Sequence, residues 1–340
     1  MHDFAIVGGG VIGLAIADAL LGAHPDAQVV VLDKESRLGL HASGRNSGVI
    51  HAGFYYSPDS LKAQLTRRGN VLMHEFCAER GIPVRETGKV VVATQAAQVE
   101  ALHELKRRAD ANGVPTEIVD ARQLREIEPL ARTIECALWS PTTASASPLG
   151  VVEGLAQRVR DGGGRVRLDS AVTAGGVGML TVNGARLRAR HVINAAGLQA
   201  DRVARWFGMC DDYEVLPFVG LYWYGNWAPG RLQRHVYPVP DSRNPFLGVH
   251  ATVTVDGRVK IGPTAIPGLW REPPSIRDAG DLLLAYPRFA LSRHHNVASL
   301  IAAELPKLSR REMVRRVRPL VPTIREADFR TRATRTHQKN

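Results

Sequence analysis

One short glycine-rich segment near the N-terminus constrains the fold more than any other part of this chain. The apolar run at residues 4–7 is followed by Gly8-Gly9-Gly10-Val11-Ile12-Gly13 and then by a helical pattern with a partly apolar face. After a break at residues 24–26, the run at 29–32 predicts a second buried strand, which ends at Asp33. A strand, glycine turn, helix and strand in this order predict a parallel α/β sheet.

Each glycine of the turn has a chemical reason to be there. Gly8 permits the tight turn, Gly10 lets the backbone approach a pyrophosphate, and Gly13 lets helix and strand pack closely. The unpaired N–H groups at the helix N-terminus bind phosphates, and the Asp33 carboxylate can accept hydrogen bonds from ribose hydroxyls. The pattern therefore predicts dinucleotide binding. The alternative is a glycine-rich turn that holds no ligand.

A later segment favours FAD over NAD as the dinucleotide. Residues 190–194 predict a strand that enters Ala195-Ala196-Gly197, with a helix expected over 199–207. Short strands expected at 165–168 and 171–173 join the same sheet. A strand that returns to the nucleotide and ends in Ala-Ala-Gly resembles the glutathione-reductase-like FAD domain. No second GxGxxG follows that would bind NADPH.

The segment between these two cofactor regions is neither a periodic helix nor an alternating strand. Residues 41–56 are rich in glycine, histidine, tyrosine and hydrogen-bonding side chains. Such a composition suits a loop pressed against a planar polar ligand. A polar surface loop is the alternative interpretation.

Net charge and cysteine content limit the classes of protein to which this chain can belong. Of the formal charge of +11, residues 307–340 supply eleven Lys/Arg against three Asp/Glu, so the rest of the chain is nearly neutral. This distribution disfavours a nucleic-acid-binding body. The three cysteines lie far apart without a CxxC pair, so neither a disulfide framework nor a metal site is expected. The absence of a long apolar run and of a signal sequence predicts a cytoplasmic protein.

Several longer segments resemble one known family. They include the stretch from Lys34 to His51, the motifs Tyr55-Tyr56 and Gly88–Thr94, and the segments at 125–129, 195–198, 237–241, 245–250 and 262–263. The match spans roughly residues 3–325. On these residues the chain is similar to the L-2-hydroxyglutarate dehydrogenase/oxidase family of FAD enzymes, within the D-amino-acid-oxidase-like superfamily.

The resemblance implies oxidation of a 2-hydroxy acid to a 2-oxo acid by hydride transfer to FAD. It also implies that electrons pass on to oxygen or to a membrane quinone. Either His51 or His250 suits the base that takes the hydroxyl proton, with His51 preferred because it directly follows the cofactor loop. Tyr55 and Tyr56 are candidate donors to the substrate carboxylate, or ordinary packing residues.

The cofactor-binding residues expected from the motif and the resemblance are Gly8, Gly10, Val11, Ile12, Gly13, Asp33, Lys34, Ser43, Arg45, Asn46, Ser47, Val172, Ala196 and Gly197. Two other functions remain open. One is an amine or amino-acid oxidase of the same superfamily, and the other is a truncated, catalytically impaired flavoprotein with a binding role.

The chain departs from the family pattern in two places. Val219 and Leu221 stand where the family typically has an arginine and a glutamate, and a valine cannot clamp a carboxylate as a guanidinium does. A substrate less charged than hydroxyglutarate is therefore an option. The family's C-terminal cofactor segment also has no counterpart: residues 330–340 are polar and basic and predict a disordered tail. That tail is a candidate for peripheral contact with an anionic membrane, such as the inner membrane.

The expected architecture is an α/β fold in two parts. A parallel-sheet FAD-binding domain takes residues 1–50 and 150–212, and a mainly antiparallel substrate domain takes 51–149 and 213–300. A helical return segment is expected at 301–329. Within the substrate domain, strands are expected at 89–94, 216–224, 246–255 and 259–261, and helices at 60–80, 95–112 and 121–127, with more helix around 278–318.

Overall fold

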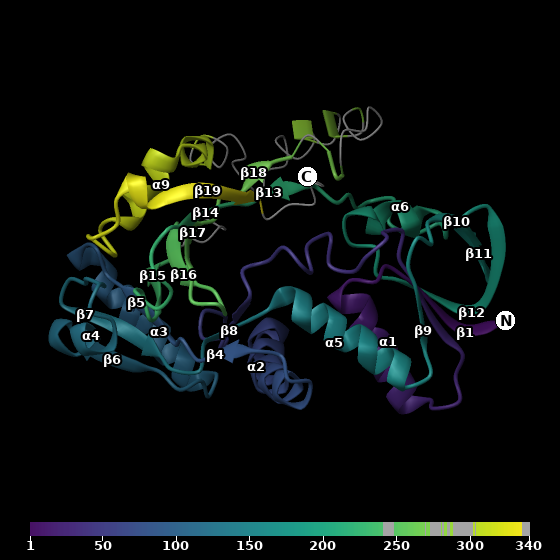
Figure 1. Ribbon diagram of the computed structural model, residues 1–340, viewed down its shortest axis with the longest axis horizontal. Helices are drawn as coiled ribbons and strands as arrows, with labels where there is room; N and C mark the ends of the chain where they lie inside the picture. Colours follow the sequence, from purple (N-terminus) through teal and green to yellow (C-terminus); the bar gives the residue numbers. More distant parts are fainter. Residues whose placement is uncertain are drawn as a thin grey trace.

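The computed structural model describes residues 1–240, 248–268, 270–272, 280, 282–283, 286–287, 302 and 304–334. Two large sheets lie at opposite ends of the molecule, with helices α2 (Leu61–Glu79) and α5 (Pro148–Asp161) between them (Figure 1). None of the helices in the described ranges is both long and apolar enough to span a membrane.

The first sheet has six strands and contains the glycine turn. Its order is β10 (Val172–Gly176), β11 (Met179–Val182), β12 (Ala185–Asn194), β1 (His2–Val7), β2 (Val29–Leu32) and β9 (Arg165–Arg167). Strands β12, β1, β2 and β9 are parallel, whereas β10, β11 and β12 form antiparallel hairpins. The predicted strands at 165–168 and 171–173 are thus confirmed as members of this sheet.

Burial on both faces explains why the central strands read as continuous apolar runs. On one face, α1 (Val11–Ala23) and α5 pack together over Ile6, Val29 and Val31. The opposite face buries Val30 and Leu32 against the β10–β12 hairpins and α6 (Ala200–Arg205). The helix predicted over 199–207 is a 3-10 turn, η2 (Gly197–Gln199), followed by α6.

The second sheet has eight strands drawn from distant parts of the chain. Its order is β19 (Phe329–Thr334), β14 (Leu221–Gly225), β17 (Val259–Gly262), β16 (His250–Val253), β15 (His235–Pro238), β5 (Lys89–Val92), β7 (Cys136–Ser140) and β6 (Glu117–Asp120). All pairs are antiparallel except β15 with β5. Two small sheets accompany it: β3 (Val49–Ile50) with β8 (Ala144–Ala146) and β4 (Val84–Arg85), and β13 (Phe218–Val219) with β18 (Ile266–Pro267).

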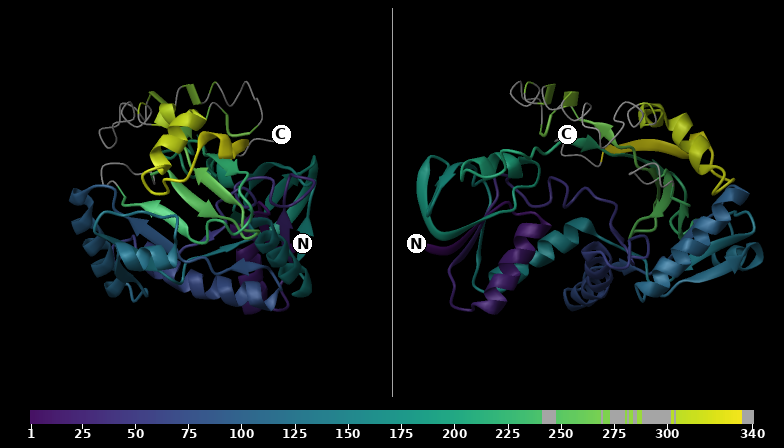
Figure 2. Two further views of the ribbon diagram at one scale, coloured as in Figure 1. Left: turned by 60° about the vertical axis from the view of Figure 1, so that its left-hand side comes forward. Right: turned by 180° about the vertical axis from the view of Figure 1, so that it is seen from behind.

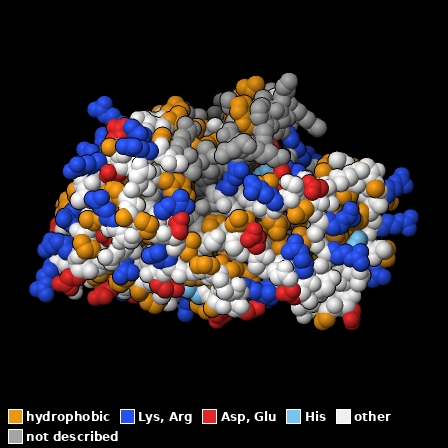
Figure 3. All heavy atoms as spheres, viewed as in Figure 1, with side chains coloured by type: hydrophobic (Ala, Val, Ile, Leu, Met, Phe, Trp, Pro, Cys, Tyr) orange, Lys and Arg blue, Asp and Glu red, His pale blue; other side chains and the backbone are white. Residues whose placement is uncertain are grey.

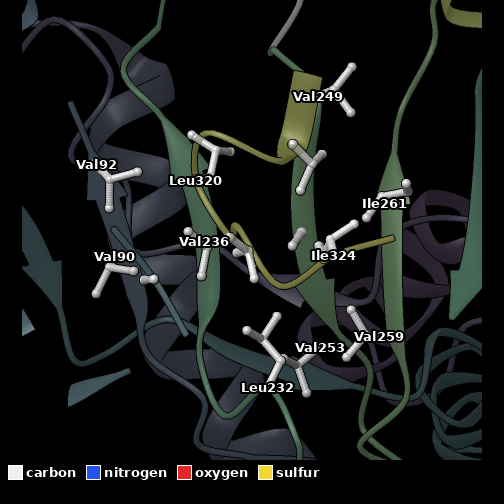
Figure 4. Close-up of a cluster of buried hydrophobic side chains, with 14 of the residues drawn as sticks. Val90, Val92, Leu232, Val236, Val249, Val253, Val259, Ile261, Leu320 and Ile324 are labelled. Carbon is white, nitrogen blue, oxygen red and sulfur yellow. The ribbon is translucent and has the colours of Figure 1, made fainter. Parts of the chain in front are cut away.

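One face of this second sheet is an apolar core. Valine and isoleucine side chains from β5, β15, β16 and β17 meet Leu320 and Ile324, which follow helix α9 (Arg310–Val317) (Figure 4). From behind, α9 is seen at the same end of the molecule as this sheet (Figure 2). Other helical elements within the described ranges include α3 (Val99–Ala111), α4 (Ala121–Ile127), η1 (Ala96–Gln98), η3 (Leu305–Leu308) and η4 (Glu326–Asp328).

The predicted disordered tail is wrong for residues 330–334. These residues continue strand β19, which pairs with β14 so that Tyr224 lies opposite Thr331 and Leu221 opposite Thr334. Phe329 at the start of the strand is fully buried in the apolar core. A polar, basic sequence is compatible with an edge strand, since backbone groups make the pairing and charged residues are common at sheet edges. Residues 335–340 lie outside the described ranges.

Three other predicted elements need adjustment. The strand expected at 216–224 is divided into β13 and β14, which belong to different sheets. The strand expected at 246–255 is β16, and residues 246–247 lie outside the described ranges. Much of the helical region expected around 278–318 also lies outside them, but η3 and α9 fall within it.

Basic side chains do not gather into a single patch on the face drawn in Figure 3. Lysine and arginine are spread over both ends of the molecule, with acidic side chains between them (Figure 3).

Candidate functional site

The glycine turn between β1 and α1 opens onto a cavity of about 530 Å³, which we name the cofactor cavity. Gly8 has a φ of +110°, a conformation that favours glycine, and a Cβ there would lie 2.3 Å from the Ala195 carbonyl oxygen. A Cβ on Gly13 would collide with the Gly8 carbonyl oxygen. The turn is therefore closed by backbone contacts that only glycine permits, as the spacing of the motif predicts.

Eleven of the fourteen predicted cofactor-binding residues line the cofactor cavity. They are Gly8, Gly10, Val11, Ile12, Asp33, Lys34, Ser43, Asn46, Val172, Ala196 and Gly197. The other three do not line it. Gly13 lies behind the turn, the Ser47 carbonyl accepts a hydrogen bond from Lys260 Nζ at 2.9 Å, and Arg45 belongs to the same loop without reaching the cavity wall.

Asp33 holds the glycine turn in place. Its Oδ2 accepts a hydrogen bond from Gly9 N at 2.8 Å, and its Oδ1 accepts one from Glu35 N at 2.9 Å. The carboxylate therefore fastens the end of β2 to the turn while it also faces the cavity. This backbone role adds to the ribose contact that the motif predicts.

The cavity wall has features that suit the diphosphate of FAD. The first turn of α1 has no acidic side chain, so nothing there repels an anion at the helix N-terminus. Ser43 Oγ accepts a hydrogen bond from Val11 N at 3.0 Å, and this bond holds the loop that contains Ser43 against the start of the helix. Asn46 braces that loop, since its amide donates to Ser43 O at 2.8 Å and its Oδ1 accepts from Gly48 N at 2.8 Å. The residues present therefore fit the predicted cofactor.

The predicted residue Lys34 has charged neighbours at the cavity wall that sequence reasoning missed, namely Glu35, His41 and Glu272. Lys34 Nζ lies 2.7 Å from Glu272 and 2.9 Å from Glu35, and His41 Nε2 lies 3.0 Å from the same Glu35. Burial lowers the pKa of Lys34, but its hydrogen bonds to the two glutamates outweigh burial and leave that pKa above the ordinary value. No sequence signal pointed to Glu272, because it comes from a segment more than two hundred residues away.

Arg271, next to Glu272, is a second residue that the sequence did not point to. It is almost fully buried and forms an ion pair with the equally buried Asp201 of α6. Its guanidinium also donates to Leu198 O at 2.9 Å. The pair anchors the segment at 270–272 to the turn that follows β12.

A second pocket of about 320 Å³, which we name the side pocket, adjoins the cofactor cavity. The two share Val11, Ser43 and Asn46 as walls. His51 lines the side pocket, and its carbonyl accepts a hydrogen bond from Asn70 of α2 at 3.3 Å. His250, Tyr55 and Tyr56 are among the lining residues of neither cavity.

His250 is buried on the face of the eight-stranded sheet that lies opposite the core of Leu320 and Ile324. Its ring stacks on Tyr237 with centroids 3.8 Å apart and planes 18° apart. Because a carbonyl oxygen can only accept, the 2.8 Å contact with Gly248 O places a proton on Nδ1.

The two tyrosines follow His51 in a loop held by helix α3. Asn112 donates to Tyr56 O at 3.1 Å, and Arg108 donates to Tyr55 O at 3.5 Å. The Tyr55 hydroxyl is buried without a hydrogen-bond partner among the described residues, and burial raises its pKa well above the ordinary value, with Tyr237 and Tyr56 adding to the effect. The ring of Tyr56 lies beneath Lys62 Nζ at 4.5 Å.

Val219 and Leu221 lie on either side of the break between β13 and β14. Thr264 bridges them, since its Oγ1 accepts from Leu221 N at 2.9 Å and lies 3.0 Å from Val219 O. Neither residue lines the cofactor cavity. Within the described ranges, no group of three His, Cys, Asp or Glu residues is arranged to hold a metal ion.

The sequence is similar to those of known proteins over about 80% of its length. L-2-hydroxyglutarate dehydrogenase of Escherichia coli (strain K12) is 37% identical over 284 residues, which is 82% of this chain and 67% of that protein. The human mitochondrial L-2-hydroxyglutarate dehydrogenase is 36% identical over 290 residues, which is 79% of this chain and 62% of that protein. The matched part therefore spans about two thirds of the length of these relatives.

Solved structures share the fold. L-alpha-glycerophosphate oxidase from Mycoplasma pneumoniae superimposes with a TM-score of 0.78 at 23% identity, over 98% of this chain and 82% of that one. Glycine oxidase from Geobacillus kaustophilus does so with a TM-score of 0.74 at 22% identity, over 98% and 81%. The sequence pattern described as "FAD dependent oxidoreductase" matches residues 3–335, so the chain that builds this glycine cradle belongs to the FAD-dependent oxidoreductase family.

Proposed function

We propose that this protein oxidises a 2-hydroxy acid, L-2-hydroxyglutarate or a related acid, to the corresponding 2-oxo acid. The observation that carries the proposal is the common wall of Val11, Ser43 and Asn46, which places the His51 pocket directly beside the cofactor cavity. The names of the relatives, which are 36–37% identical, support the choice of a hydroxy acid over other substrates. Electrons would pass from the cofactor to oxygen or to a quinone.

In this reaction the cofactor and the protein have different roles. When bound, FAD accepts the hydride that leaves the substrate carbon. A residue of the chain must take the hydroxyl proton, and a neutral imidazole suits this because its ordinary pKa lies near working pH. We assign this role to His51, since it lines the side pocket of about 320 Å³ next to the cofactor cavity, and its backbone is held by Asn70.

His250 is the second candidate for the base. Gly248 O holds a proton on Nδ1 and Tyr237 fixes the ring plane, so a neutral ring would carry its lone pair on Nε2. Its burial is the reason that His51 is preferred. Tyr55 remains the candidate donor to the substrate carboxylate: a raised pKa keeps its hydroxyl protonated, and a buried hydroxyl without a partner can donate to an incoming acceptor.

We assign residues 1–50 and 150–212 to the cofactor-binding domain and 51–149 with 213–300 to the substrate domain. The six-stranded sheet falls within the first unit and most of the eight-stranded sheet within the second. Strand β19 is added to the second unit because it pairs with β14.

The proposal is tested by an anaerobic titration of the FAD-loaded protein. L-2-hydroxyglutarate, its D enantiomer, smaller L-2-hydroxy acids and glycine are added in turn while the visible flavin band is recorded. Bleaching by an L-2-hydroxy acid is expected. Bleaching by glycine alone would indicate the amine-oxidase alternative, and full FAD loading without bleaching by any 2-hydroxy acid would contradict the proposal. Reoxidation by oxygen or by a soluble quinone then identifies the acceptor.

A further inference from the structure

Two walls of the cofactor cavity come from opposite sides of the glycine turn. In the six-stranded sheet, β1 lies between the parallel strands β12 and β2, so the end of β1 that carries the turn has a strand end on each side. Lys34 follows β2, whereas Leu198 and Asp201 follow β12. Lys34 and Leu198 both line the cavity. A dinucleotide in such a crevice lies across the carboxyl ends of the strands, and therefore between these two walls.

The dipeptide Arg271-Glu272 joins the two walls. Arg271 holds the β12 side, since its Nη2 donates to Asp201 Oδ2 at 2.7 Å and its Nη1 donates to Leu198 O at 2.9 Å. Glu272 holds the β2 side, because its Oε2 lies 2.7 Å from Lys34 Nζ. Glu272 itself lines the cavity. Two adjacent residues from a distant part of the chain therefore form a bridge from one side of the glycine turn to the other.

The two ends of this bridge differ in how easily they can open. Arg271 and Asp201 are both buried and make a bidentate ion pair, and separating them would leave two buried charges without partners. The side chains of Lys34 and Glu272 are 37% and 23% exposed, so water can replace their contact at a much lower cost. Lys34 also keeps a second partner, Glu35, at 2.9 Å. The end that can open is therefore the one between Glu272 and Lys34.

We propose that Glu272 is a cofactor-retaining residue: anchored by Arg271, it closes the crevice against Lys34 and slows the passage of FAD in both directions. A residue that only contacts FAD would stabilise the bound state and slow release alone. A bridge that must open before the cofactor can pass slows entry and release by the same factor and leaves the affinity unchanged. The inference concerns the exchange of the cofactor, so it does not depend on which substrate the protein oxidises.

The test measures the rates of FAD entry and FAD release by stopped-flow flavin fluorescence. Entry is recorded when apoprotein is mixed with excess FAD, and release when FAD-loaded protein is mixed with an excess of another flavin-binding apoprotein. The wild type is compared with Glu272→Gln, which keeps the size and removes the charge, and with Glu272→Ala, which removes that end of the bridge. We expect both rate constants to rise about three- to tenfold in Glu272→Gln and at least as much in Glu272→Ala. The Kd for FAD should stay within about twofold of the wild-type value, because the two rates change together.

Glu312→Gln is the matched control. Glu312 pairs with Arg315 and Arg316 on α9, at the opposite end of the molecule from the six-stranded sheet (Figure 1), and it does not line the cofactor cavity. This variant should leave both rates unchanged. Wild-type rates in both Glu272 variants would overturn the proposal. Faster release with unchanged entry would also overturn it, because Glu272 would then be a contact of the bound cofactor and not a bridge. Both rates are measured without substrate, so they decide the inference even where no 2-hydroxy acid is oxidised.

Discussion

The carbonyl oxygen of Gly8 lies 2.0 Å from the position that a Cβ on Gly13 would occupy. Alanine at position 13 must push the turn away from helix α1, at a cost of about 1–3 kcal/mol that is typical of overpacking. We expect FAD affinity to fall by about ten- to a hundredfold, measured by fluorescence quenching. Gly22→Ala on the same helix is the control, because a Cβ there meets nothing within 4 Å. Equal losses in the two variants would contradict this view of the turn.

His51→Gln tests the proposed base. We expect the rate of flavin reduction by the substrate to fall by about 10²–10⁴-fold, the usual contribution of general-base catalysis. FAD affinity should not change, because His51 lines the side pocket rather than the cofactor cavity. Stopped-flow absorbance measures the rate. A normal rate in His51→Gln with a slow rate in His250→Gln would transfer the role to His250.

The effect of Lys89 on stability should depend on pH. The folded state lowers the pKa of this lysine from 10.5 to about 7, so the unfolded chain binds more protons between these values. The free energy of unfolding of the wild type should therefore rise with pH across that window. Lys89→Met should be more stable than the wild type by about 2–4 kcal/mol at pH 6, and by much less at pH 10. Urea unfolding at the two pH values measures the difference, and an equal difference at both would refute the reasoning.

Phe329→Ala tests whether β19 is an integral strand. The side chain is fully buried in the apolar core, so we expect a loss of about 3–5 kcal/mol in the free energy of unfolding. Ile134→Ala, at a side chain that is 41% exposed, should change stability by no more than about 0.5 kcal/mol. Chemical denaturation compares the two. A negligible effect at Phe329 would mean that this segment is not an integral strand and would favour the disordered tail that its composition predicts.

Val219→Arg tests the specificity expected from the family resemblance. A guanidinium at the start of this break between β13 and β14 can pair with a second carboxylate, and such a charged hydrogen bond contributes about 1.5–3 kcal/mol. We expect kcat/KM for L-2-hydroxyglutarate to rise about tenfold relative to that for L-2-hydroxybutyrate. Val219→Leu should leave the ratio unchanged. A ratio that stays constant in Val219→Arg would mean that position 219 does not meet the substrate.

The sequence by itself was sufficient to predict the strands, turn and helix that begin the cofactor-binding sheet. The glycine spacing, the apolar runs that flank it and Asp33 predicted the strand–turn–helix unit and the part of the cavity wall that it forms, since a tight turn and a doubly buried strand each restrict the residues that can build them. Ala196 and Gly197 were predicted from the resemblance of their turn to the glutathione-reductase-like FAD domain, and they follow a strand of the same sheet.

Only the tertiary structure decided the rest. Lys89, His235 and His250 come together because strands β5, β15 and β16 pair in one register, and no local pattern specifies which distant strands become neighbours. The pairing of β19 could not be predicted for the same reason. An edge strand is stabilised by the backbone of its partner, so its polar sequence does not indicate that it is a strand. A glycine turn is formed by adjacent residues and can be predicted from them, whereas the face of a sheet is formed by distant segments that meet only when the chain has folded.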